Sequence, residues 1–265
     1  MNRSAVDPVV CSIGCTDPTS AAGLFLDAAV YARLGVPATY VVAGVTAQNS
    51  MGVSGLTALP PRAIVAQLQA IWRQVSPRAV RIGLLPGKEA VDAVSLFFRS
   101  LRARPPVIVD PVLSATSGYR FARAGYVGAL RRLLAVATLV TPNATETAEL
   151  TGLPVRTVDE AVRAALALSE SSNCAVLVTG GHLRGRDRVV DVLALAGRTK
   201  RFKARRLGGD VRGTGCMLAA ALAAWLARGE PLERALVRAR AFVRGAIASA
   251  RRLGKGRRQL RVGPR

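Results

Sequence analysis

The sequence has little of what several classes of functional site require. It contains one histidine and four cysteines, and aromatic residues make up only 5% of the chain. Few aromatic side chains means few surfaces on which nucleic-acid bases could stack. The cysteines lack the paired spacing of a zinc site, so we expect reduced thiols at positions 11, 15, 174 and 216.

Long apolar runs are also missing. The longest nearly apolar helical pattern covers residues 217–227, which is shorter than the roughly 20 residues that a membrane-spanning helix needs. Together with the expected free thiols, this favours a cytoplasmic protein that does not insert into a membrane.

Acidic residues are scarce as well. The chain has 38 Lys and Arg residues against 16 Asp and Glu, a net charge of +22. Such an excess can indicate nucleic acid, a membrane surface or small anions as partners. The arginines are dispersed rather than aligned, so we expect most of them on solvated helix faces and do not expect nucleic acid as a partner. The dense basic end, 251–265, is the exception; we expect a domain over 1–250 and a tail that could be flexible or touch a polyanion.

Apolar strand patterns alternate with helical ones along the chain. Continuous β-branched runs separated by helices indicate a mostly parallel sheet covered on both faces, here in a single α/β domain. Strands are predicted at 9–14, 38–44, 79–85, 106–110, 138–142 and 175–180, followed by 188–195 and a strand near position 201. Helices are predicted at 21–34, 61–75, 88–101, 122–135, 158–169, 215–228 and 231–251.

Several of the few acidic residues follow predicted strands. Asp17, Asp110 and Glu146 come at or just after strand ends, and Asp27 follows in the first helix. Ligands of such sheets bind at the carboxyl ends of the strands, so these side chains predict a site. Structural roles are the alternative. Asp17 could cap a turn, and Asp27 could be an exposed helix carboxylate. Asn143, three residues before Glu146, could be a helix N-cap.

The segment GTGC (213–216) opens the longest apolar helix. Glycine lets the backbone approach a ligand closely, and the free N–H groups of a helix start favour an anion such as phosphate. The same environment would shift Cys216 towards the thiolate, which could accept a proton or hold a substrate hydroxyl. The alternative is that Cys216 is a small buried apolar residue.

Six short motifs occur in a characteristic order: TAQNS (46–50), RIGLL (81–85), VDPV with ATSG (109–118), TPNATE (141–146), VTGGH (178–182) and GTGC (213–216). In this order they resemble the hydroxymethylpyrimidine/phosphomethylpyrimidine kinase family of thiamine biosynthesis, within the ribokinase-like superfamily. The resemblance covers about residues 9–248. It implies a ribokinase-like domain that uses ATP and Mg²⁺ to phosphorylate 4-amino-5-hydroxymethyl-2-methylpyrimidine and then its monophosphate.

The resemblance also implies roles on the reactive side of the site. Gly213, Thr214 and Gly215 would surround the transferring phosphoryl group, with Cys216 as the catalytic residue beside them. Metal and nucleotide would be held by a set of polar residues: Asp110 and Glu146 for Mg²⁺, and Asn143, Glu146, Thr179 and Arg212 for the nucleotide.

On the acceptor side, Gln48 would hydrogen-bond the aminopyrimidine. The rest of this pocket would consist of Ala22, Asp27, Thr46, Leu84 and Val112.

Three positions depart from the family pattern. The glycine-rich first loop is replaced by TSAAG (19–23), Thr179 stands where a lysine is usual, and Arg212 where a histidine is usual. These changes leave the reaction class intact and put the choice of substrate in doubt.

A pyridoxal or pyridoxine kinase of the same fold is therefore an alternative, as is a non-catalytic basic protein that binds a ligand or nucleic acid. The expected partners are the pyrimidine alcohol, its phosphate and ATP, and a homodimer remains open.

Overall fold

The computed structural model describes residues 7–183 and 187–262 and contains a central nine-stranded sheet. The strand order is β3-β2-β1-β4-β5-β6-β7-β8-β9. Six strands run parallel: β1 (Val10–Thr16), β2 (Ala38–Gln48), β4 (Ala79–Ile82), β5 (Val107–Val109), β6 (Leu139–Val140) and β7 (Ala175–Val178). Antiparallel strands extend both edges: β3 (Val53–Ala58), β8 (Arg188–Leu195) and β9 (Arg198–Arg205).

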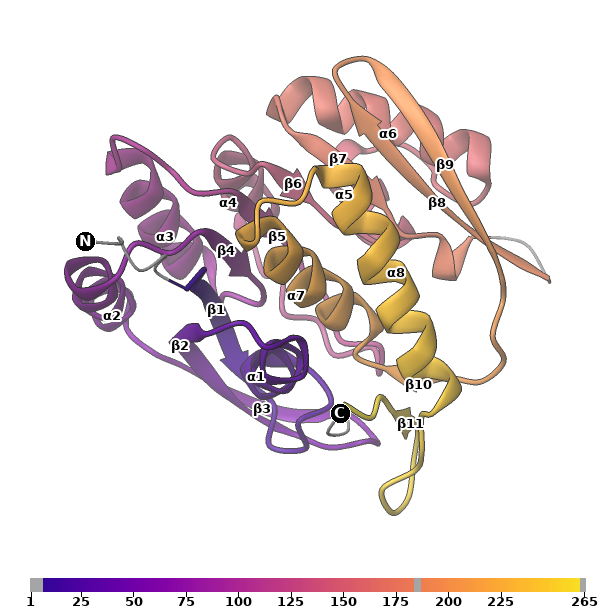
Figure 1. Ribbon diagram of the computed structural model, residues 1–265, viewed down its shortest axis with the longest axis horizontal. Coiled ribbons are helices and arrows are strands. Elements are labelled where there is room, and N and C mark those ends of the chain that lie inside the picture. Colours follow the sequence, from indigo (N-terminus) through magenta and orange to yellow (C-terminus); the bar gives the residue numbers. More distant parts are fainter. Residues whose placement is uncertain (1–6, 184–186, 263–265) are drawn as a thin grey trace, which may run out of the picture.

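Helices cover both faces of the sheet, as the buried strand patterns require. One face carries α2 (Pro61–Gln74), α3 (Lys88–Ser100), α4 (Tyr126–Leu134), α5 (Ala144–Thr151) and α6 (Val158–Ser172). The other carries α1 (Gly23–Leu34), α7 (Thr214–Ala227) and α8 (Leu232–Ala248), which lie in front of the sheet in Figure 1. A short 3-10 turn, η1 (Gly180–His182), follows β7.

The predicted α/β architecture is confirmed. Each predicted strand and helix is present, although several are shorter than predicted; the strand at 138–142, for example, is only two residues long. The antiparallel strand β3 was not predicted. No helix within residues 7–183 and 187–262 is long and apolar enough to cross a membrane.

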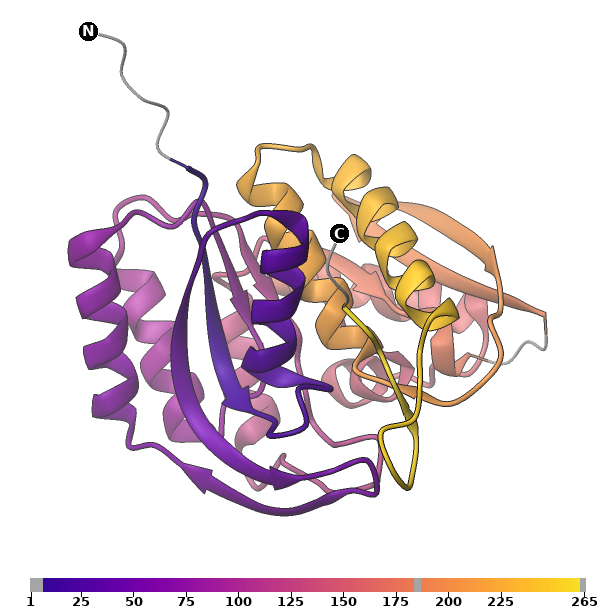
Figure 2. The ribbon, with the colours of Figure 1, turned by 60° about the horizontal axis from the view of Figure 1, so that its bottom comes forward.

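The C-terminal segment folds back onto the domain. After α8, residues Arg258–Gln259 form β11, which pairs in parallel with β10 (Val211–Arg212) just before α7. Gln259 and Leu260 are buried. Figure 2 shows this segment beside the turn between β2 and β3. Part of the basic region that we treated as a separate tail is therefore paired with the strand that precedes the GTGC segment.

Candidate active site

A cavity of about 250 Å³ lies at the carboxyl edge of the parallel strands. This edge collects the residues that follow β1, β2, β4, β5, β6 and β7, because parallel strands all end on the same side of the sheet. Of the predicted site residues, all except Asp27 line the cavity. The structure thus brings together residues that are up to about 200 positions apart in the sequence.

The amino end of α7 forms one wall of the cavity. Gly213 precedes the helix with a left-handed backbone (φ +84°), and no side chain caps the helix start. The first N–H groups of an α-helix have no partner within the helix, and the helix dipole adds positive potential there. Thr214, Gly215 and Cys216 all line the cavity. This wall is suited to an anion.

Asp110 lies opposite this helix end. A Cβ atom placed on Gly215 would be 4.0 Å from Asp110 Oδ1. The other carboxylate oxygen of Asp110 accepts a 2.6 Å hydrogen bond from Nη2 of Arg81. Asp110 is therefore held by one oxygen, while the other faces the helix start.

Arg81 is completely buried between two carboxylates. Its Nη1 lies 3.3 Å from Asp27 Oδ2, and its Nη2 contacts Asp110. Gly83 is required for this arrangement, because a Cβ at that position would lie 2.0 Å from Arg81 Nη1. The two aspartates raise the pKa of Arg81, which keeps the guanidinium charged despite its burial.

The structure corrects the prediction for Asp27. We expected a substrate-binding carboxylate, but the side chain is fully buried and does not line the cavity. It accepts a 2.6 Å hydrogen bond from Ser12 and pairs with Arg81. The physical reason is its position on the inner face of α1, which packs against the sheet. Asp27 is linked to the cavity through Arg81, which also pairs with Asp110.

Asn143 and Glu146 line the far side of the cavity and also begin α5. The side chain of Asn143 accepts from the Glu146 N–H (3.0 Å), and that of Glu146 accepts from the Asn143 N–H (2.8 Å), which forms a capping box. Asn143 is therefore an N-cap and a cavity residue at once. Burial, and secondarily the charge of Asp110, raise the pKa of Glu146 to about 8.

Glu146 predicts a pH dependence of stability in the absence of divalent metal. The unfolded carboxyl ionises near pH 4.5 and the folded one near pH 8, so rising pH favours the unfolded state between these values. The contribution of Glu146 to the free energy of unfolding should be fully present below about pH 4.5. It should then fall by at most about 1.4 kcal/mol per pH unit up to about pH 8.

Urea titrations in a chelating buffer between about pH 5 and 8 measure this slope. Glu146→Gln is the matched variant, because its amide oxygen can still accept from the Asn143 N–H. The variant should have a shallower slope than the native chain. Equal slopes for the two proteins would contradict the prediction.

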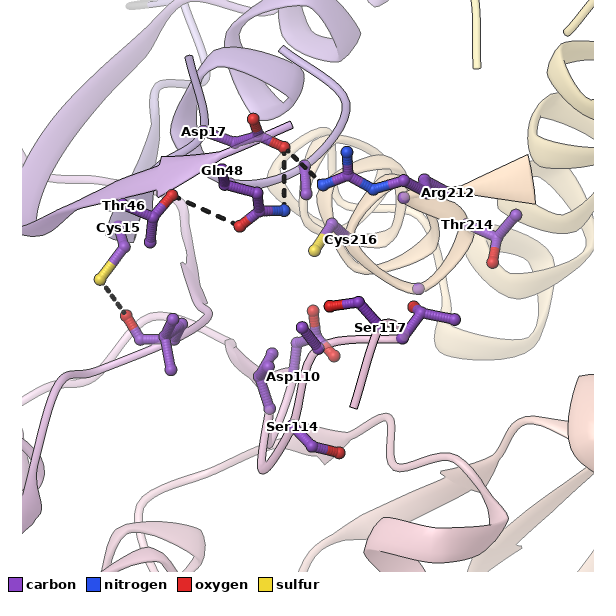
Figure 3. A pocket seen from close by; sticks show the side chains of 18 of the residues that line it. Cys15, Asp17, Thr46, Gln48, Asp110, Ser114, Ser117, Arg212, Thr214 and Cys216 are labelled. Carbon is purple, nitrogen blue, oxygen red and sulfur yellow. Dashed lines mark hydrogen bonds and ion pairs between the residues drawn. The ribbon is translucent and has the colours of Figure 1, made fainter. Parts of the chain in front are cut away.

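A hydrogen-bonded network forms the wall beside β1 and β2. Asp17 accepts from Gln48 Nε2 (3.2 Å) and from Arg212 Nη2 (3.1 Å), and also from the Thr19 N–H (2.9 Å) as a turn cap. Thr46 donates to the Thr16 carbonyl at 2.7 Å. In Figure 3 Asp17, Gln48 and Arg212 lie on one side of the cavity and Asp110 and Ser114 on the other, with Cys216 between them. Arg212 is thus already paired with a buried carboxylate.

The environment of Cys216 differs from our expectation. We predicted that the helix start would shift the thiol towards the thiolate. Instead, burial raises the pKa of Cys216 to about 12, and the charge of Asp110 adds to this effect, while Arg81 lowers the pKa only in part. The thiol is therefore protonated at neutral pH.

Three features of the cavity were missed at the level of sequence. Arg81 interrupts an otherwise apolar strand, a pattern that could have indicated a buried ion pair. Residues 114–117 contribute to the rim, and Arg257 reaches the cavity from the C-terminal segment. For Arg257 no local pattern distinguishes it from the neighbouring arginines.

The chain is similar in sequence to known proteins of one family. The family model described as phosphomethylpyrimidine kinase matches residues 17–261. The chain is 36% identical over 254 residues to a hydroxymethylpyrimidine/phosphomethylpyrimidine kinase of Rhizobium meliloti, covering 94% of each chain.

Two solved structures are similar as well. The phosphomethylpyrimidine kinase of Clostridium difficile superposes with a TM-score of 0.80 at 27% identity, over 91% of this chain and 99% of that one. The pyridoxal kinase of Staphylococcus aureus in complex with AMP-PCP has a TM-score of 0.89 at 24% identity, over 98% and 95% of the two chains. The second likeness establishes the fold alone.

Proposed function

Because the chain belongs to the phosphomethylpyrimidine kinase family, we propose that it transfers the γ-phosphoryl group of ATP to 4-amino-5-hydroxymethyl-2-methylpyrimidine and then to the resulting monophosphate. The observation that carries this proposal is the shared cavity of the α7 start, Asp110 and Glu146. Phosphoryl transfer requires mainly the positioning of reactants and the stabilisation of spread negative charge. An uncapped helix start opposite two carboxylates is suited to both tasks.

The residues present fit a magnesium ion bound together with phosphate. Within the described chain, no group of three or more His, Cys, Asp and Glu side chains could hold a metal ion unaided. Mg²⁺ in kinases is usually bound by one or two carboxylates, with phosphates and waters completing the shell. Asp110 and Glu146 would supply those carboxylates. Burial is the main reason that the pKa of Glu146 is raised, and the charge of Asp110 adds to it, an effect that a bound cation would offset. When bound, the ion would neutralise charge on the phosphates.

The α7 start would receive the transferring phosphoryl group. Backbone N–H groups aimed at developing negative charge are often the largest single contribution to catalysis. Thr179 and Asn143 would lie on the nucleotide side, where a backbone bridge joins them. Arg212 pairs with buried Asp17, so it could contact the nucleotide only by leaving that carboxylate.

The acceptor would bind against the network of Gln48 and Asp17. An amide and a carboxylate side by side can pair with the alternating acceptors and donors of an aminopyrimidine. Leu84 and Val112 line the same cavity and supply apolar surface for the ring, with Ala22 and Thr46 at its edge.

The protonated thiol changes the role that we propose for Cys216. A thiol with a pKa near 12 cannot serve as a resident base at neutral pH. The thiol would instead hold the acceptor hydroxyl next to the phosphorus. The hydroxyl proton would leave late in the transfer: it would pass first to the transferred phosphoryl group and from there to solvent. A positioning contact predicts a loss of roughly tenfold in Cys216→Ala, whereas removal of a general base would cost about 10²–10⁴-fold.

Product analysis with ATP, Mg²⁺ and the free pyrimidine alcohol tests the proposed function. We expect the monophosphate to appear first and the diphosphate second, with little product from Glu146→Ala. Pyridoxal, offered as the sole acceptor at the same concentration, should be the poorer substrate. A chain that phosphorylates pyridoxal but not the pyrimidine alcohol, or neither of them, would overturn the proposal.

A further inference from the structure

Three arginines line the cavity in the described part of the chain, and two of them are already neutralised. Arg81 lies between Asp27 and Asp110, with 1% of its side chain exposed. Arg212 pairs with buried Asp17 and has 9% of its side chain exposed. Neither can turn towards a ligand without leaving a buried carboxylate unpaired, which is strongly unfavourable.

The third arginine is different. Arg257 Nε lies 2.7 Å from Asp210 Oδ2, and the exposed fractions of the two side chains are 33% and 59%. Exposed ion pairs of this kind contribute little to stability. An arginine can therefore exchange such a carboxylate for a phosphate, which its planar guanidinium binds in bidentate fashion.

The C-terminal segment holds Arg257 at the cavity. Arg257 directly precedes β11, whose partner β10 leads into the GTGC segment. The Ser50 hydroxyl, in the β2–β3 turn, donates to the carbonyl of Lys255. Arg258 donates to the Gly208 carbonyl, which ties the segment to the chain before β10. Figures 1 and 2 both show the segment next to β10 and the β2–β3 turn.

The two proposed transfers make different demands on the site. In the first, a neutral hydroxyl oxygen forms a bond to the γ-phosphorus of ATP, the bond from that phosphorus to the β,γ-bridging oxygen breaks, and one proton is released. In the second, the attacking atom is a phosphate oxygen of the monophosphate, and the same bond to ADP breaks. The hydroxyl of the alcohol has been esterified by then, so none remains to be positioned. The phosphate carries a charge of about −1.5 to −2 and requires a cation to offset repulsion from ATP.

We propose that Arg257 binds the phosphate of the monophosphate acceptor and thereby determines the specificity of the second transfer. The inference rests on the proposed function. It assigns to the C-terminal segment a part in recognising the phosphorylated substrate, and it separates the two transfers: Cys216 serves the hydroxyl acceptor, and Arg257 serves the phosphate acceptor.

Arg257→Met tests this assignment, with each transfer assayed separately from its own acceptor. We expect the KM for the monophosphate to rise roughly 10- to 100-fold, the value of one lost hydrogen bond to a charged group, with the first transfer nearly unchanged. Calorimetry without ATP should show the same 10- to 100-fold weaker binding of the monophosphate to Arg257→Met and unaltered binding of the alcohol.

Three further variants separate a binding role from a structural one. Asp210→Asn breaks the same ion pair but leaves the cation, so the second transfer should stay near the native rate if Arg257 binds phosphate. Arg252→Met is the matched control, since Arg252 lines only the neighbouring cavity, whereas Arg257 lines both cavities. Arg257→Lys should recover part of the lost affinity.

Two results would overturn the inference. One is an equal loss in Asp210→Asn and Arg257→Met, which would indicate that the ion pair only anchors the segment. The other is an equal effect of Arg257→Met on both transfers together with a raised KM for ATP, which would place Arg257 on the nucleotide. If the native chain fails to phosphorylate the pyrimidine alcohol at all, the proposed function fails instead.

Discussion

Replacement of Arg81 by methionine is expected to lower the free energy of unfolding by about 3–5 kcal/mol, the usual cost of removing one partner from a buried ion pair. Methionine would leave Asp27 fully buried without its cation and Asp110 without its 2.6 Å hydrogen bond. Urea denaturation followed by tryptophan fluorescence measures the change. The phosphoryl-transfer rate should also fall, since Asp110 would no longer be held opposite the α7 start.

The double variant Asp27→Asn/Arg81→Met is the control for this mechanism. It removes the buried carboxylate together with the guanidinium, so it should be more stable than Arg81→Met by about 1–2 kcal/mol. Arg81→Lys keeps a charge but lacks the planar fork that reaches both aspartates, and it should lie between the native chain and Arg81→Met. If Arg81→Met is as stable as the native chain, the burial of the two aspartates does not require this cation and the prediction is wrong.

Gly213→Ala is expected to lower kcat for both transfers about 10²–10³-fold, comparable to the loss of an anion-hole donor in other enzymes. Alanine does not fit at this position for two reasons. Gly213 has a left-handed backbone, and a neighbouring loop approaches it closely. A Cβ on Gly213 would meet the Ala21 carbonyl oxygen at 1.9 Å. The start of α7 would have to move away from that loop, and its N–H groups would lose their alignment with the phosphoryl group. Steady-state kinetics with each acceptor measures the loss.

Gly229→Ala is the matched control for backbone strain. Gly229 lies just after the carboxyl end of the same helix with nearly the same backbone angle (φ +79°), and nothing lies within 4 Å of its added Cβ. It should cost about 1–2 kcal/mol of stability and leave kcat unchanged. If the two alanine variants lose activity equally, the effect of Gly213→Ala is one of general strain and not of the anion site.

The sequence was sufficient to predict the architecture and most of the cavity. Buried strand patterns alternating with helices require a parallel sheet with helices on both faces. In such a sheet all parallel strands end at one edge, so Gln48, Asp110 and Asn143 could be expected near each other before their order across the sheet was known. The same holds for the GTGC segment, whose residues line this cavity and whose helix start is suited to an anion.

Other properties depend on contacts between distant segments, which no local pattern encodes. Asp27 is buried because α1 turns that face towards the sheet, where Arg81 from β4 reaches it. The pKa of Cys216 is raised because packing partly buries its thiol and β5 brings Asp110 beside it.

The amino-acid sequence by itself determined the fold class, the edge of the sheet at which the cavity forms and the helix that begins at the GTGC segment, since these follow from periodicity and backbone geometry. Only the tertiary structure decided which charges are neutralised and which remain available. Whether a charged side chain is neutralised depends on its burial and on its ion-pair partner. Arg257 and its partner Asp210 lie 47 positions apart in the chain, and the pairing of β11 with β10 brings them together.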